Sequence, residues 1–130
     1  MAKEDAIRRW KEIIDEDMSV AEDLFKTKHW LYVAFMCHQV VEKSLKAYWT
    51  ATRDDDPPYI HDHKRLAEGC GLYDRLTEEQ RVFLTMIREM NIEARYREYK
   101  SRIAASLNEN NTKHLLEQTK QIQQWISQQF

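Results

Sequence analysis

Apolar residues between Trp30 and Trp49 recur with a helical period, and this stretch contains neither Gly nor Pro. At roughly 100° per residue, they fill one face wider than half the circumference. This face holds Val33, Ala34, Met36, Cys37, Val40, Val41, Leu45, Ala47 and Tyr48. The polar residues on the remaining arc are His38, Gln39, Glu42, Lys43 and Lys46. Because so broad an apolar face needs several neighbours, we predict a central helix over residues 30–52, with Trp30 and Leu45 among its buried side chains.

Three further amphipathic stretches predict long helices around this central one. The first, from Asp5 to Lys26, lies only three residues before the central helix, so the two helices should be antiparallel neighbours. The second begins at the capping box Thr77-Glu78-Glu79-Gln80 and is expected to run to about Ala94. The third begins at Asn111 or Thr112 and continues to the end of the sequence.

Shorter signals predict how these helices are joined. The acidic run before Pro57 and Pro58 ends the central helix in an exposed loop. Asp62 is a candidate N-cap for a short helix through Cys70. Residues 95–100 are expected to unwind, and residues 101–107 fit either another helical turn or a loop. We therefore predict an all-α fold over residues 1–130, an up-and-down bundle of four long helices plus one short helix.

Composition supports this fold class and excludes several functions. Asp, Glu, Lys and Arg make up 32% of the residues, with only two Gly and two Pro, which suits helices better than strands. The formal net charge of -2 means that any nucleic-acid site must be a local patch. The charged N-terminus lacks a signal-peptide core, and no apolar run approaches the roughly 18 residues that a membrane span requires. Two cysteines without metal-type spacing fit a reducing cytoplasm.

The polar arc of the central helix has two interpretations. Glu42 and Lys46 are four residues apart in the order that favours an ion pair, and His38 shares their face. The arc is either a solvated surface stabilised by such pairs or the wall of a groove that binds phosphate. The sequence leaves both open.

Another candidate is the segment RYREYK, which combines positive charge with aromatic rings. Its positively charged residues are Arg95, Arg97 and Lys100, and Arg102 follows two residues later. Its aromatic residues are Tyr96 and Tyr99. Arginine recognises phosphate through two parallel hydrogen bonds, and tyrosine stacks on bases. In the alternative interpretation, the rings pack beneath helix ends while the arginines pair with Glu93 and Glu98.

The sequence His61-Asp62-His63 suggests a metal site at first sight. No second ligand cluster lies at a suitable spacing, so helix capping and packing explain these residues better. We predict no metal and no cofactor. The sequence also lacks a P-loop, a GxGxxG motif and a recognisable nucleophile triad.

Three stretches together resemble the HEPN (higher eukaryotes and prokaryotes nucleotide-binding) domain family over nearly the whole chain. They are Gln39-x-x-Glu42-Lys43-x-x-Lys46-Ala47, His61-Asp62 followed by Leu66, and Ala94-Arg95-Tyr96. The resemblance implies a helical bundle that forms a homodimer. It also implies association with a small nucleotidyltransferase, sometimes as a toxin–antitoxin pair.

Many HEPN domains are metal-independent RNases with an Arg-x4-6-His motif. Counted from Arg95, the histidine would fall at Lys100, Ser101 or Arg102. Lysine and arginine replace imidazole poorly in proton transfer at neutral pH. We therefore predict binding with little or no cleavage.

These observations favour a nucleotide- or nucleic-acid-associated binding module. The residues expected to bind phosphate are Lys43, Lys46, Arg95 and Arg102, with Tyr96 shaping the groove. Two alternatives remain. One is an RNase with an altered catalytic set, in which Arg95 stabilises the scissile phosphate. The other is a structural partner whose bundle face docks a nucleotidyltransferase chain.

Overall fold

The chain is helical throughout the computed structural model, which describes residues 2–93 and 95–130. No β-strand occurs within these residues. The α-helices are α1 (Ala2–Lys26), α2 (Trp30–Thr52), α3 (His63–Gly69), α4 (Glu78–Ile87), α5 (Arg97–Ser106) and α6 (Glu109–Gln128). Two short 3₁₀ helices, η1 (Tyr73–Arg75) and η2 (Arg88–Met90), follow α3 and α4.

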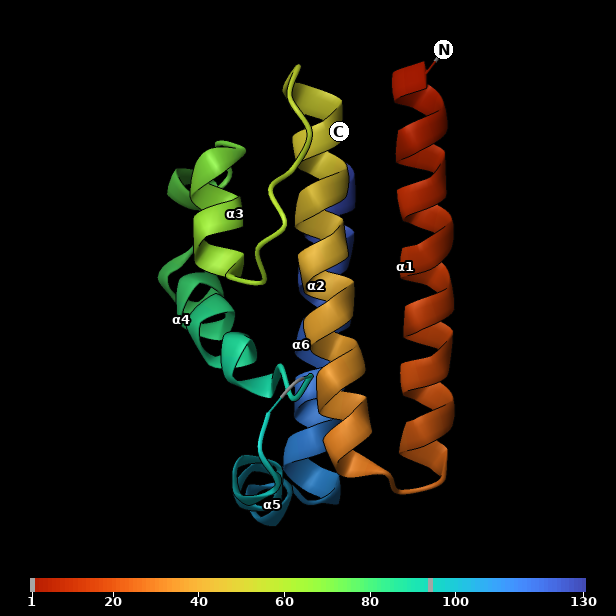
Figure 1. Ribbon diagram of the computed structural model, residues 1–130, viewed down its shortest axis with the longest axis vertical. Coiled ribbons are helices and arrows are strands. Elements are labelled where there is room, and N and C mark those ends of the chain that lie inside the picture. The colour runs from red at the N-terminus through yellow and green to blue at the C-terminus, as the bar shows by residue number, and fades with distance from the viewer. Residues whose placement is uncertain (1, 94) are drawn as a thin grey trace.

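Helix α2 is the centre of the molecule, as its apolar period predicted. It contacts each of the other α-helices. Figure 1 shows α1 and α6 running along α2, while α3 and α4 lie on the side of α2 that faces away from α1. Helix α5 lies at the end of the bundle where α1 and α2 are joined (Figure 1). This arrangement covers α2 from several directions.

The core follows the broad apolar face of α2. Ala34, Cys37, Val41 and Leu45 are at most 1% exposed. Buried partners come from the surrounding helices and include Ala21, Leu66, Phe83, Leu84, Leu115 and Ile122. Trp30 is only partly buried, which corrects the prediction, because it occupies the first turn of α2 and packs on Phe25 of α1.

The third predicted long helix is shorter than expected. It begins at its capping box, as predicted, but α4 ends at Ile87 and η2 ends at Met90. The side chain of Asn91 then accepts a hydrogen bond from the Glu93 backbone amide, which competes with a further helical turn. Ile92 is buried in this non-helical stretch. The predicted end at Ala94 lies outside the described residues.

Helices α5 and α6 correct two further predictions. Residues 97–106 form α5, so only Arg95 and Tyr96 of the segment expected to unwind are non-helical. Helix α6 begins at Glu109, because Asn108 and Asn111 form a reciprocal capping box with hydrogen bonds of 2.8 and 2.9 Å. We predicted four long helices and one short helix. The structure has three long helices (α1, α2 and α6), two helices of ten residues (α4 and α5) and the short α3.

Both cysteines lie in the interior, and neither belongs to a reactive site. Burial raises the pKa of the Cys37 thiol to about 12, and burial also raises the pKa of Cys70. A thiol that keeps its proton is a poor nucleophile and a poor metal ligand. In the described part of the chain, no helix is long and apolar enough to cross a bilayer.

Candidate functional site

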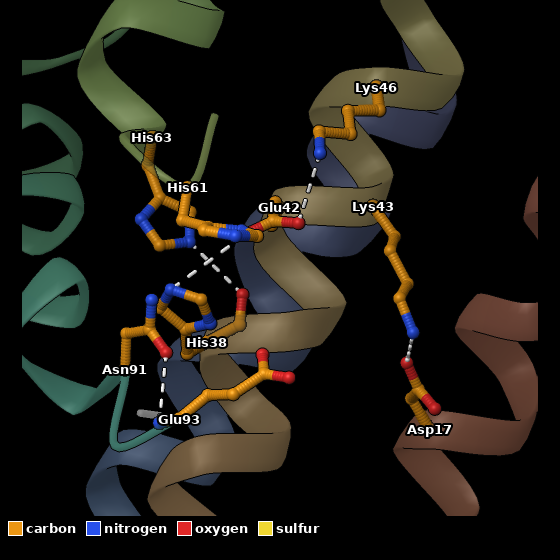
Figure 2. Close-up of polar contacts among 9 residues, drawn as sticks. All are labelled: Asp17, His38, Glu42, Lys43, Lys46, His61, His63, Asn91 and Glu93. Atoms are coloured by element: carbon orange, nitrogen blue, oxygen red, sulfur yellow. Dashed lines mark hydrogen bonds and ion pairs between the residues drawn. The ribbon is translucent and has the colours of Figure 1, made fainter. Parts of the chain in front are cut away.

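A buried carboxylate on α2 organises a cluster of polar side chains. Glu42 is 4% exposed, and its Oε1 atom lies 2.8 Å from Nδ1 of His61. Its Oε2 atom accepts a hydrogen bond of 3.2 Å from Nζ of Lys46, which is itself buried. We call His38, Glu42, Lys46, His61 and His63 the Glu42 cluster (Figure 2).

Helix α2, the loop after it and helix α3 build this cluster. His38, Glu42 and Lys46 repeat every four residues, which places them on one side of α2. His61 belongs to the loop between α2 and α3, and His63 is the first residue of α3. The loop and α3 therefore cover the side of α2 that carries His38 and Glu42, and the cluster lies between α2 and these two segments.

Asp62 fixes the position of its two histidine neighbours. Its carboxylate caps α3 by accepting a hydrogen bond of 3.2 Å from the Arg65 amide, and it pairs with Arg88 of η2 at 3.1 Å. Partial burial opposes ionisation, but the Arg65 amide and the Arg88 guanidinium outweigh it and lower the pKa of Asp62. The cap that the sequence predicted therefore anchors α3 to η2 as well.

His38 and His63 form the uncharged floor of the cluster. Burial lowers the pKa of His38 to about 3 and that of His63 to about 4, so both imidazoles are neutral at pH 7. Nε2 of His63 donates to the His38 carbonyl oxygen at 3.0 Å, and the ring centroids are 4.6 Å apart. Both ring nitrogens of His38 and Nδ1 of His63 have no hydrogen-bond partner among the described residues. These two rings act by packing and not by titration near neutral pH.

His61 is the member of the cluster that reaches solvent. Its side chain is 54% exposed, whereas that of Glu42 is 6% exposed. When a neutral imidazole donates from Nδ1 to a carboxylate, its Nε2 atom carries the lone pair. The Glu42–His61 pair thus has the geometry of a proton acceptor held in one orientation. Within the described residues, no three His, Cys, Asp or Glu side chains are grouped to hold a metal ion.

A second candidate lies at the start of α5. The basic segment, residues 95–102, has exposed side chains at Arg95, Tyr96, Arg97 and Arg102. No carboxylate of the described residues lies within 4.0 Å of its Arg and Lys nitrogens. Unpaired guanidinium groups present free donors in the geometry that matches phosphate oxygens.

Comparison with known proteins decides the family. The HEPN domain family model matches residues 7–129, nearly the whole chain. The chain belongs to the HEPN family. No curated protein and no solved structure matches it significantly.

Two of the three stretches that resemble HEPN sequences meet in the Glu42 cluster. Glu42 belongs to the stretch on α2, and His61 begins the next one, so their 2.8 Å contact joins both. The third stretch contributes Arg95 and Tyr96 to the basic segment, while Ala94 lies outside the described residues. The HEPN stretches therefore supply both candidate sites.

The predicted phosphate-binding lysines already have partners in this HEPN domain. Nζ of Lys43 lies 2.5 Å from the Asp17 carboxylate of α1, and Lys46 pairs with Glu42. Figure 2 shows Lys43 and Lys46 pointing to different sides of α2, so they do not form a single wall. The solvated-surface interpretation also fails for Glu42 and Lys46, since both are buried. Arg95, Tyr96 and Arg102 remain together in the basic segment.

Sequence reasoning did not find the contact between Glu42 and His61. Both residues were noted, Glu42 in the polar arc and His61 as a rejected metal ligand. A contact between them could have been predicted only by pairing the carboxylate on the central helix with the histidine at the end of the following loop. A loop of ten residues does not specify by its sequence where it folds back.

Proposed function

We propose that this HEPN domain binds nucleotides or single-stranded RNA through the basic segment. The observation that carries the proposal is the exposure of its arginines without carboxylate partners among the described residues. Tyr96 is 85% exposed beside them, and an exposed ring can stack on a base. Lys43 and Lys46 would contribute only if a ligand displaced their present carboxylate partners.

Titration of fluorescein-labelled RNA at two salt concentrations tests this function. We expect binding at low salt that weakens as salt rises, because phosphate contacts release counterions. Arg95→Ala should weaken binding by about tenfold, the scale of one charged hydrogen bond. Arg9→Ala, which removes an exposed arginine from α1, is the matched control and should bind like wild type. Absence of binding at low salt, or equal binding by both variants, would exclude the basic segment as the site.

We infer further that the domain is a cytoplasmic homodimer and the partner of a small nucleotidyltransferase, as in a toxin–antitoxin pair. Family membership supports this inference. The exposed large apolar side chains include Ile13, Tyr32, Val82 and Phe130. Such surfaces commonly mark interfaces when they are contiguous. Light scattering should give twice the monomer mass at micromolar concentration, and a monomer would contradict the homodimer. Co-expression with the neighbouring gene product should yield a stable complex, and the absence of a complex would contradict the nucleotidyltransferase partnership.

The Glu42–His61 pair favours a second candidate function, RNA cleavage with an altered catalytic set. In this reaction Nε2 of His61 would take the proton of a ribose 2′-hydroxyl as that oxygen bonds to the adjacent phosphorus. The bond from phosphorus to the 5′-oxygen would break, the imidazolium would return the proton to that oxygen, and Arg95 would stabilise the phosphate. The Arg-x4-6-His motif is not met at positions 100–102, so this function needs His61 as the substitute. Cleavage of RNA in the presence of EDTA that His61→Gln abolishes would support it. If the protein binds RNA measurably and the RNA stays intact, the cleavage function is wrong and only the binding function remains.

A further inference from the structure

One aromatic ring connects two arginines of the basic segment. The guanidinium carbon of Arg95 lies 4.7 Å from the centroid of the Tyr99 ring, and that of Arg102 lies 5.1 Å from the same centroid. These are cation–π distances. Both guanidinium groups thus lie against the same ring, with their carbons at most about 10 Å apart.

The Tyr99 ring is itself held in place. Its hydroxyl donates a hydrogen bond to the Glu89 carbonyl oxygen of η2, which fixes one edge of the ring. Burial, followed by the nearby Glu89 carboxylate, raises the pKa of Tyr99, so the hydroxyl remains a neutral donor at pH 7. The ring is therefore a stable support for both arginines.

Stacking leaves the hydrogen-bonding edges of the guanidinium groups available. A guanidinium that lies over a ring uses its face, while its five N–H donors point outward in the guanidinium plane. Neither Arg95 nor Arg102 has an ion-pair partner in the described part of the chain, in contrast to Arg53 and Arg88, which pair with aspartates. The two donor edges are thus both oriented and unoccupied by carboxylates.

We infer that Arg95, Tyr99 and Arg102 form a clamp for two successive phosphates of a single-stranded nucleic acid. This inference rests on the proposed binding function and deepens it. The two arginines offer two separate donor edges beside one ring, so each can hold one phosphate of the strand. Tyr99 is a positioning residue, because it acts through the arginines, and the exposed Tyr96 remains free to stack on a base.

The clamp is tested with substitutions that keep the charge constant. The probe is a fluorescein-labelled single-stranded RNA of about eight nucleotides, a length typical of such sites. Arg102→Lys should weaken its binding by about tenfold, because lysine keeps the charge but loses the planar donor edge. Arg9→Lys is the matched control, since Arg9 is an exposed arginine of α1 that lies outside the basic segment. It should bind like wild type.

A second pair of variants tests the ring. Tyr99→Leu should weaken binding to a similar extent although no charge changes, and Tyr99→Phe, which retains the ring, should restore most of it. Thermal unfolding of each variant shows that the fold is intact. Unlabelled RNA should compete for the probe, and adenosine monophosphate, with its single phosphate, should compete far more weakly.

The outcomes separate this inference from the function on which it rests. If wild type binds no RNA at low salt, both are wrong. If wild type binds RNA and Arg102→Lys, Arg9→Lys and Tyr99→Leu all bind equally well, only the clamp is wrong. Competition by adenosine triphosphate without competition by unlabelled RNA would overturn the assignment to a nucleic-acid backbone.

Discussion

Nδ1 of His61 lies 2.8 Å from Oε1 of Glu42, so a residue of the loop after α2 is bound to a carboxylate on the buried side of that helix. The second oxygen of Glu42 is bound to Lys46 at 3.2 Å. A buried carboxylate requires such partners, because desolvation of an unpaired charge is unfavourable. The contact of His61 with Glu42 therefore holds the end of the loop from Arg53 to Asp62 against α2, in addition to the covalent connections of the loop to α2 and α3.

Removal of the Glu42 carboxylate should destabilise the fold strongly. Glu42→Ala leaves the ammonium of Lys46 buried without its partner, which costs about 3–5 kcal/mol in comparable cases. Urea denaturation measures the change in the free energy of unfolding. Glu117→Ala, at an exposed position of α6, is the control and should stay within about 0.5 kcal/mol of wild type. Equal stability of the two variants would show that Lys46 reaches water without Glu42.

Stability should decrease in mild acid because of His38 and His63. Their pKa values are lowered to about 3 and about 4, whereas a histidine in the unfolded chain titrates near 6.5. Below about pH 6.5 the unfolded state thus binds more protons, and the stabilising contribution of each neutral histidine falls as the pH approaches its folded pKa. The limiting slope is about 1.4 kcal/mol per pH unit for each histidine.

Urea denaturation at intervals between pH 7 and pH 5 measures this slope. His38→Leu removes one of the two groups and should reduce the slope by about half, while His29→Leu, at an exposed position, should leave it unchanged. A slope in His38→Leu equal to that of wild type would mean that His38 is protonated as easily in the folded protein as in the unfolded chain.

Leu45→Ala should show how much the core around α2 contributes. Leu45 is 1% exposed, and truncation of a buried leucine costs roughly 2–5 kcal/mol through lost burial and the cavity left behind. Val82→Ala, at a side chain that is 60% exposed, gives the comparison and should change stability by less than about 0.5 kcal/mol. A marginal effect at Leu45 would count against a tightly packed bundle.

Substitution of Gly69 should destabilise the fold more than substitution of Gly71. A Cβ atom at Gly69 would lie 2.2 Å from the ring of Trp49, so Gly69→Ala forces the ring or α3 to move, at a cost of about 1–3 kcal/mol. Gly71 has open space but a φ of +82°, which asparagine tolerates better than alanine. Thermal unfolding should therefore show that Gly71→Asn is milder than Gly69→Ala. The opposite order would place Trp49 away from α3.

Local sequence signals predicted the elements that depend on nearby residues. The limits of α2 agree with its uninterrupted apolar period, and the N-caps Asp62 and Thr77 agree because each binds an amide three residues later. The capping box of α6 was missed because Asn111 stands where Glu or Gln is the usual partner.

Features that depend on distant contacts were not predictable in the same way. Residues 88–94 continue a helical composition, and only burial of Ile92 and the Asn91 hydrogen bond explain why α4 stops. The sequence left Glu42 and Lys46 as either a surface pair or part of a groove wall, and their burial depends on a loop that folds back. The contact between Arg102 and Tyr99 has a helical spacing of three residues, but Arg95 precedes α5, so its contact with the same ring was not predictable from spacing.

The short turn between α1 and α2 has a consequence for the order of folding. Helix α1 packs mainly on α2, its neighbour in sequence, and little on α6. Contacts between adjacent segments form early because they close only a small loop, whereas α6 must return to α2 from the far end of the chain. During synthesis the α1–α2 hairpin can form while the apolar face around Cys37 and Leu45 still lacks its cover from α6. We expect nascent chains to be most prone to aggregation in that interval.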